Sequence, residues 1–355
     1  MRTRLPALAL ALAVPASLAL TGAPAAAQPD QHPLSWHPVP VDTTQGLRGL
    51  DAVSHKTAWV SGSAGGVWRT TNGGADWVDV SPDGAEGLAF RDIEAHSARH
   101  ASVLSIGNGP DSRIYTTSDG GQTWHLAFVN DDPAAFYDCM DFFPGGRRGL
   151  AMSDPVDGKF RVLATDDGGR SWDVVPADGM PPAVDGEFGF AASGTCLVTE
   201  GPRDAWIASG GAASRIFHSR DRGLTWEVTE APIPAGPTAG VYGLAFRNRH
   251  EGVAVGGDFT VPANGVDGSG RTGDGATWQS GGDLGGYRSG VDWVSRHSDT
   301  LIAVGPTGSD VSTDAGSTWS TFDTVGYDSV VCTRQRLCWA SGPGGRVATM
   351  GTSRH

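Results

Sequence analysis

The stretch TSDGGQTW at residues 117–124 decides the fold, because closely related stretches recur along the chain. It places an Asp-x-Gly turn between hydroxyl residues and ends in a tryptophan. We call these stretches boxes; they end at Trp77 (TTNGGADW), Trp124, Trp172 (TDDGGRSW), Trp226 (SRDRGLTW), Trp278 (RTGDGATW) and Trp319 (STDAGSTW). Successive box tryptophans lie 47, 48, 54, 52 and 41 residues apart. That spacing is the length of one four-stranded blade of a β-propeller.

Each box has the chemistry of a tight hairpin turn. An Asx side chain accepts hydrogen bonds from nearby backbone N–H groups, and glycine supplies the positive φ that such a turn needs. The fifth box has Gly273 in the Asx position with Asp274 next to it, which predicts a distorted hairpin. Alternating apolar and polar residues around the boxes indicate strands, and no segment has a sustained helical period. The residues expected to play this structural role are Asn72, Asp119, Asp167, Asp221 and Asp314.

The two ends of the chain complete a seventh unit. GGRVATMG near the C-terminus matches the approach to the first box and stops where a seventh box would begin. LSWHPVPV at residues 34–41 matches the end of a box and its outer strand. The sequence therefore predicts an all-β, seven-bladed β-propeller whose last blade is closed by an N-terminal strand, which removes the exposed edge. The expected blades cover residues 46–80, 86–129, 135–176, 187–230, 239–281, 287–323, and 327–350 together with 34–40.

Residues 1–27 have the order of a secretory signal peptide. Two arginines precede an apolar run that is short for a membrane span, and small residues ending at Ala27 follow. We expect residues 28–355 to form one propeller domain that is secreted, monomeric and without a membrane span.

The charge balance argues against a polyanionic partner. The chain has 26 Lys and Arg against 39 Asp and Glu, a formal net charge of -13, and Lys56 and Lys159 are its two lysines. Binding to phosphate backbones needs clustered basic residues, so we expect no nucleic-acid partner.

Four cysteines in an exported chain suggest two disulfides. Cys139 and Cys196 occupy equivalent inner-strand positions in neighbouring expected blades, whereas Cys332 and Cys338 flank a five-residue turn. We therefore predict the pairs Cys139–Cys196 and Cys332–Cys338.

The boxes resemble the Asp-box, or bacterial neuraminidase repeat, which forms the hairpin between the third and fourth strands of a blade. Together with inner strands such as LRGLDAV and FRDIEA, they make residues 34–350 similar to the exported propellers related to photosystem II stability/assembly factor. This resemblance implies a role in binding or assembly. In plant and cyanobacterial relatives an arginine patch contacts a membrane-protein partner, and Arg48 and Arg91 match that patch in part. Some relatives carry an oxidoreductase label, but this sequence has no flavin, nicotinamide, haem or copper signature, so no cofactor is predicted.

The candidate binding surface is the face opposite the boxes. Loops that join second to third strands gather there with the connections between blades, and four of the five tyrosines fall where inner strands begin, at the mouth of the central channel. Tyr287 and Arg288 are expected on its exposed rim. The alternative is that these polar and aromatic residues merely plug the channel. The candidates are Arg48, Arg91, Tyr137, Asp154, Asp157, Glu187, Tyr242, Asp258, Tyr287, Arg288, Asp310 and Tyr327.

The favoured function is binding of a protein or a glycan at this mouth. The leading alternative is a glycoside hydrolase of the sialidase type, which needs an arginine cluster, a tyrosine nucleophile paired with Glu, and an acid/base Asp. Sialidases resemble six-bladed rings, however, and their Arg-Ile-Pro stretch is missing here, so no catalytic residue is predicted. No metal site is predicted either: the histidines form no ligand pattern, and the calcium-like loop at residues 267–274 lacks a terminal bidentate acid.

Overall fold

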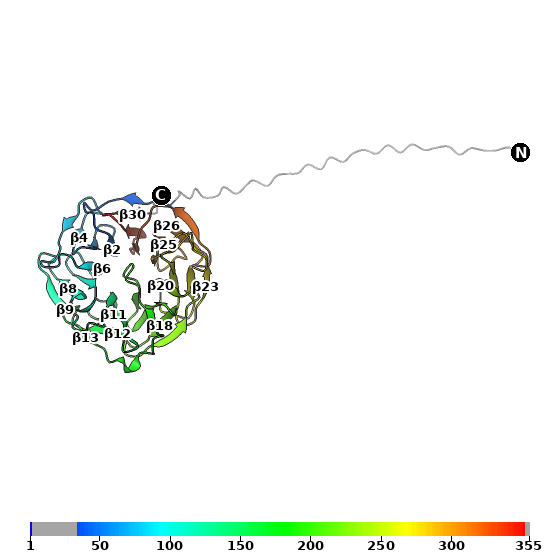
Figure 1. Ribbon diagram of the computed structural model, residues 1–355. Helices are drawn as coiled ribbons and strands as arrows, with labels where there is room; N and C mark the ends of the chain where they lie inside the picture. Colours follow the sequence, from blue (N-terminus) through cyan, green and yellow to red (C-terminus); the bar gives the residue numbers. More distant parts are fainter. Residues whose placement is uncertain (2–33, 352–355) are drawn as a thin grey trace. The chain divides into compact units, whose positions relative to one another are not determined.

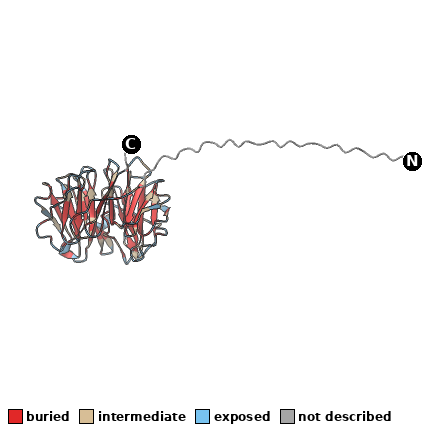
Figure 2. Ribbon diagram, turned by 90° about the horizontal axis from the view of Figure 1, so that it is seen from above, coloured by how far each residue is buried: buried red, intermediate tan, exposed pale blue. Residues whose placement is uncertain are grey.

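The computed structural model describes Met1 and residues 34–351. Apart from Met1, the expected signal peptide lies outside the described residues. Residues 34–351 form seven β-sheets arranged in a ring (Figure 1). Buried residues fill the sheets, as Figure 2 shows from the side. Within this described part of the chain no helix is long and apolar enough to span a membrane.

Blades 1 to 4 follow one another along the chain, and each runs outward from its first strand. Blade 1 contains β2 (Leu47–Ala52), β3 (Ala58–Gly62), β4 (Val67–Thr70) and β5 (Val78–Asp79). Blade 2 contains β6 (Ala89–Ala95), β7 (Ala101–Ile106), β8 (Arg113–Thr117) and β9 (His125–Val129). Blade 3 contains β10 (Tyr137–Phe142), β11 (Gly149–Val156), β12 (Lys159–Thr165) and β13 (Asp173–Val174). Blade 4 contains β15 (Leu197–Glu200), β16 (Asp204–Ala208), β18 (Arg215–Ser219) and β19 (Glu227–Glu230).

Blades 5 to 7 complete the ring. Blade 5 contains β20 (Gly236–Phe246), β21 (Gly252–Asp258), β22 (Ser269–Thr272) and β23 (Gln279–Gly282), and its sheet is extended by β14 (Glu187–Phe188) and β17 (Gly210–Gly211). Blade 6 contains β24 (Gly290–Trp293), β25 (Leu301–Gly305), β26 (Gly308–Ser312) and β27 (Ser320–Asp323). Blade 7 contains β28 (Ser329–Cys332), β29 (Leu337–Ser341), β30 (Val347–Gly351) and β1 (His37–Pro38). Two short 3-10 turns, Gly109–Asp111 and Ala177–Gly179, lie in loops.

The two ends of the described chain close the ring, as the sequence predicts. β1 pairs antiparallel with β30, with His37 opposite Thr349 and Pro38 opposite Ala348. The pairing continues past β1, because Val39 N donates to Val347 O at 2.8 Å. An N-terminal strand therefore covers the edge of β30 that would otherwise be open to another chain.

The boxes hold neighbouring blades together through their tryptophans. Trp124 Nε1 donates to Val80 O of the preceding blade at 2.7 Å, and the indole meets Trp59 edge to face with ring centroids 6.4 Å apart. Trp77 makes the same kind of contact with Trp339 at 6.1 Å, which joins blade 1 to blade 7. Each such contact buries apolar surface between sheets that have no strand pairing to hold them.

The turn of the second box shows how its acid is used. Asp119 accepts hydrogen bonds from Thr117 Oγ1 at 2.9 Å, Thr123 N at 3.0 Å and Thr123 Oγ1 at 2.6 Å. The Thr123 hydroxyl is the largest of the influences that lower the pKa of Asp119 to about 2. Equivalent contacts surround Asn72, Asp167, Asp221 and Asp314. The side-chain oxygens of these five residues accept hydrogen bonds from their own turns.

The fifth box is shorter than the others, and the expected position of its acid is wrong. Thr272 Oγ1 donates to Asp274 Oδ1 at 3.0 Å, so Asp274 rather than Gly273 holds the Asx position. One residue fewer follows it, and Asp274 accepts from Ala276 N at 2.9 Å and Thr277 N at 2.7 Å. This box also differs from the others at its tryptophan, because the buried Trp278 Nε1 has no hydrogen-bond partner within the described residues.

Both predicted disulfides are present. Cys139 of β10 is bonded to Cys196, which directly precedes β15, with Cα atoms 5.9 Å apart. Cys332 is bonded to Cys338 across the β28–β29 pair, with Cα atoms 3.9 Å apart. The first bond links two blades, whereas the second lies within one blade.

Candidate functional site

The mouth of the channel is built by a β-bulge that recurs near the start of the inner strands. β2, β6, β10 and β20 each shift register against their second strand at one residue. A bulge leaves that residue unpaired and redirects its side chain. Ser289 and Asp328 occupy the matching places just before β24 and β28. We call these six residues the mouth ring: Arg48, Arg91, Asp138, Tyr242, Ser289 and Asp328.

The two arginines of the mouth ring lie close to one of its two aspartates, Asp328. Arg48 Nη2 lies 3.9 Å from Asp328 Oδ1, and 38% of the Arg48 side chain is exposed. Arg91 is half-buried and its Nε has no hydrogen-bond partner within the described residues. Burial, reinforced by repulsion from Arg48, lowers the pKa of Arg91 to about 10. Burial raises the pKa of Asp328, while Arg48, Arg91 and Arg346 oppose that rise. Several guanidinium groups therefore share one carboxylate.

A buried cluster of aromatic rings adjoins the mouth ring at Tyr242. Phe190 stacks on Tyr242 with centroids 3.9 Å apart, and Tyr242 meets Tyr287 edge to face at 4.7 Å. The Tyr242 hydroxyl donates to Thr238 O at 2.8 Å. Burial raises the pKa of both tyrosines, so neither is prepared to act as a nucleophile at neutral pH.

The channel beneath the mouth is crossed by the segment that precedes β15. Ser193 Oγ donates to Ser289 O of the blade 6 entry at 2.7 Å, and Ser329 Oγ of blade 7 donates to Ser193 O at 3.4 Å. A Cβ on Gly194 would lie 2.4 Å from Asp92 Oδ1 of blade 2. A segment that enters blade 4 thus touches blades 2, 6 and 7, so part of the plugging expected from the sequence comes from backbone.

Several residues expected at the mouth are instead buried in ion pairs. Arg288 Nε donates to Asp310 Oδ2 at 2.8 Å, and both side chains are fully buried. The expectation that Tyr287 and Arg288 form an exposed rim is therefore wrong, because Tyr287 is also only 5% exposed. Arg215 Nε donates to Glu187 Oε1 at 3.0 Å in a second buried pair. These pairs anchor the loops around the mouth and leave no free charge for a ligand.

The remaining candidates lie in other surroundings. Tyr137 of blade 3 packs against Phe128 of blade 2, and burial raises the pKa of Tyr137 to about 12. Tyr327 packs against Trp36 at 5.4 Å in the core of blade 7. Asp157 is exposed in the β11–β12 turn, and Asp258, the last residue of β21, accepts from Thr238 Oγ1 at 2.8 Å.

Asp154 belongs to a buried carboxyl pair. It accepts a hydrogen bond from Gly189 N at 2.7 Å, and burial raises its pKa to about 6. Burial and the nearby charge of Asp154 raise the pKa of Asp138 well above its ordinary value. A proton held by this pair at neutral pH would relieve their mutual repulsion.

A second group of carboxylates links neighbouring blades at the end of the inner strands opposite the mouth. Asp51 Oδ2 accepts from Ala95 N of the next blade at 2.7 Å, and Asp292 Oδ2 accepts from Cys332 N at 2.7 Å. Burial raises the pKa of Asp51 to about 6 and that of Asp292 to about 7. These acids replace strand pairing between blades. No group of three or more His, Cys, Asp or Glu side chains among the described residues could hold a metal ion.

Asp138, Asp328 and Arg346 lie at the mouth but were not among the predicted residues. The repeat itself could have indicated the two aspartates. When the inner-strand stretches LRGLDA, FRDIEA and YDCMDF are aligned, the second residue of each is the bulged residue that faces the mouth. The predicted mouth residues in blades 3 and 7 were the tyrosines Tyr137 and Tyr327, each of which lies one residue before the aspartate of the mouth ring. Arg346 could not be found that way, since it comes from the β29–β30 loop.

The fold and site define the chain as a seven-bladed β-propeller with two arginines beside the carboxylate of Asp328 at the mouth of its channel. No protein-family model and no curated protein sequence matches it.

Solved structures share the architecture at low identity. A structure described as YCF48 bound to D1 peptide matches with a TM-score of 0.63 and 12% identity, covering 91% of this chain and 96% of that chain. YCF48 from Cyanidioschyzon merolae matches with a TM-score of 0.60 and 14% identity, covering 89% and 98%. The GH74 enzyme of Niastella koreensis matches with a TM-score of 0.61 and 14% identity, but only 53% of that chain is covered against 88% of this one. At these identities the similarity shows the fold alone.

Proposed function

We propose that the protein is a binding module that receives a protein segment at its channel mouth, with a carboxylate of that segment held by Arg48 and Arg91. One observation carries the proposal: among the described residues these two arginines, on adjacent inner strands, share with Arg346 the nearby carboxylate of Asp328. A guanidinium held partly out of water binds a carboxylate well, because its planar fork matches the two oxygens.

The architecture supports this role. A YCF48 structure of the same fold contains a peptide, and a comparable binding or assembly function here would need only the mouth surface. We further propose that the boxes are Asp-boxes, that residues 1–27 direct export, and that the exported protein is a monomer. Two disulfides are compatible with an oxidising compartment.

Peptide selection tests the proposal without knowledge of the natural partner. Random peptides displayed with free C-termini are selected on the immobilised protein. We expect the enriched peptides to share a carboxylate, internal or C-terminal, and to bind Arg48→Gln/Arg91→Gln at least about ten-fold more weakly. Arg113→Gln, at the start of β8, is the matched control. Enriched peptides that bind the double variant as well as the wild type would reject the proposal.

Glycoside hydrolysis is the second candidate, and the Asp138–Asp154 pair favours it. Two carboxyl groups with raised pKa values resemble the acid and base that glycosidases use. A panel of fluorogenic glycosides tests this activity. Turnover that disappears in Asp154→Asn would support hydrolysis, whereas turnover unaffected by that change, or none at all, would exclude this pair as its catalyst.

A further inference from the structure

The face opposite the mouth carries a ring of positive charge. Seven hairpins join the first and second strands of the blades, and we call them the hairpin ring. They hold ten Lys and Arg residues against two acids, a net charge of +8. The ring consists of residues 53–57, 96–100, 143–148, 201–203, 247–251, 294–300 and 333–336, and its basic residues are Lys56, Arg99, Arg147, Arg148, Arg203, Arg247, Arg249, Arg296, Arg334 and Arg336.

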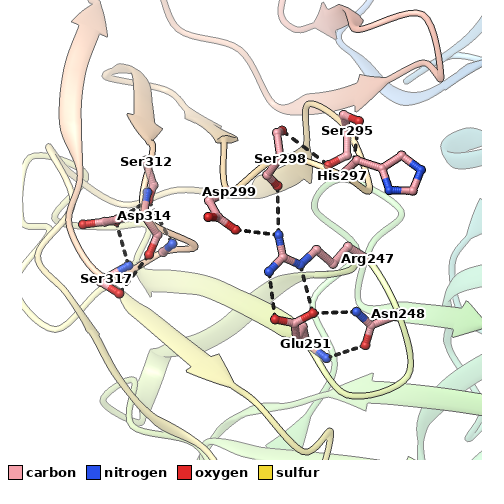
Figure 3. A network of polar contacts seen from close by, with 11 residues as sticks. Arg247, Asn248, Glu251, Ser295, His297, Ser298, Asp299, Ser312, Asp314 and Ser317 are labelled. Atoms are coloured by element: carbon pink, nitrogen blue, oxygen red, sulfur yellow. Dashed lines mark hydrogen bonds and ion pairs between the residues drawn. The ribbon is translucent and has the colours of Figure 1, made fainter.

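Most of this charge is exposed and has no acidic partner. All ten basic residues except Arg247 are exposed. Both acids of the hairpin ring are bound to Arg247, with Glu251 Oε1 at 2.8 Å and Asp299 Oδ1 at 2.7 Å (Figure 3). Arg296 pairs with Glu200 at 2.7 Å. The other eight form no ion pair with any described residue, so their charge is available to a partner.

The rest of the molecule has the opposite sign. The loops and connections at the mouth end of the strands contain thirteen acids against two arginines, a net charge of -11. The box turns, which surround the hairpin ring on its own face, hold seven acids and three arginines, a net charge of -4. Positive charge is therefore concentrated around the ring axis at one end of a protein whose net charge is -13. An extended anionic surface would attract this end and repel the other.

Two hollows open on the same face. One of about 440 Å³, between blades 3 and 4, is lined by Arg148 and Arg222 together with Phe143 and exposed Leu224, and also by Asp166, Asp173 and Asp221. Another of about 430 Å³ lies between blades 4 and 5 and is lined by three arginines and by Glu200 and Asp204. Both hollows therefore mix acids with arginines, and the excess of positive charge lies on the exposed residues of the hairpin ring.

We propose that the hairpin ring docks the protein on the surface of a bilayer that contains anionic phospholipids, with the channel mouth directed away from the membrane. The basic residues are spread over all seven hairpins instead of following one line, which matches a flat array of phosphates better than a polynucleotide strand. The exposed part of the hairpin ring offers no Phe, Tyr or Trp side chain on which a base could stack, since Phe143 is buried and its exposed aromatic rings are those of histidines. This docking is independent of the proposed peptide site and involves none of its residues.

Vesicle sedimentation tests the docking with the mature full-length chain. We expect binding to vesicles that contain phosphatidylglycerol, little binding to phosphatidylcholine alone, and release by salt. Because each basic contact strengthens partition about five-fold, Arg147→Glu/Arg148→Glu and Arg334→Glu/Arg336→Glu should each weaken it about twenty-fold or more. Arg113→Glu/Lys159→Glu has the same charge change at the opposite end of the strands and should retain binding.

Melting temperatures of the charge-reversal variants that equal that of the wild type would show that the substitutions act on docking and not on folding. Equal binding to both vesicle types, equal loss in the control variant, or binding to an RNA homopolymer or heparin without vesicle binding would each overturn the proposal. Loss of peptide binding in Arg48→Gln/Arg91→Gln with vesicle binding retained would separate this inference from the proposed function.

Discussion

Arg288 is expected to stabilise the ring and not to contact a ligand, and Arg288→Met tests that role. The substitution keeps much of the side-chain volume but leaves the fully buried Asp310 without its cation. Asp310 would retain the hydrogen bonds from Gly285 N at 2.9 Å and Thr321 Oγ1 at 2.6 Å, which reduce the loss without cancelling it. Breaking one side of a buried pair costs about 3–5 kcal/mol.

Thermal unfolding followed by circular dichroism measures this cost. For a domain of this size the loss corresponds to a melting temperature lower by roughly 5–15 °C. Arg288→Met/Asp310→Leu should recover most of it, because an apolar pair no longer contains an uncompensated charge. Arg99→Met removes an exposed arginine and should leave stability within about 0.5 kcal/mol. If Arg288→Met melts within 1–2 °C of the wild type, roughly the error of the assay, the burial argument is refuted.

Three further predictions concern the closure of the ring, its disulfides and its carboxylates. Deleting residues 34–41 exposes the edge of β30, so light scattering should show association, and a monomer of unchanged stability would contradict the closure. Replacing Cys139 and Cys196 by Ser opens a 57-residue loop and should cost about 4 kcal/mol, against about 2 kcal/mol for the six-residue loop of the other disulfide, and denaturant unfolding that reverses this order would refute the estimate. Burial raises the pKa of Asp141 and of Asp292 to about 7, so the folded state binds more protons than the unfolded state. Stability should therefore fall as the pH rises from about 4 to about 7, and a melting temperature that rises over this range would contradict this reasoning.

The repeat made the architecture predictable. Six boxes and two matching half-units predicted the number of blades. Closure by β1 followed because residues 34–41 match the end of a box and its outer strand. Both disulfides followed from register, since Cys139 and Cys196 lie at the same level of adjacent inner strands. Local turn chemistry and pairwise register are properties that a sequence carries directly.

The details of the site were less predictable, because they depend on contacts between distant residues. Whether Arg288 reaches solvent or Asp310 is decided by packing across blade 6, which no periodicity reveals. The path of Ser193 across the channel depends on blades 6 and 7. Each hairpin of the hairpin ring has one or two basic residues in the sequence. The overall charge of -13 gave no indication that they gather at one end of the fold.

The most direct test of the account is a calorimetric titration at the mouth. The best peptide from the selection is synthesised with its carboxylate free and with that carboxylate amidated, and each form is titrated into the wild type and into Arg48→Gln/Arg91→Gln. We expect the free carboxylate to bind the wild type at least about ten-fold more tightly than the amide, and this difference to disappear in the double variant. Equal affinity of the two peptide forms for the wild type, or a difference that persists without the two arginines, would contradict this expectation.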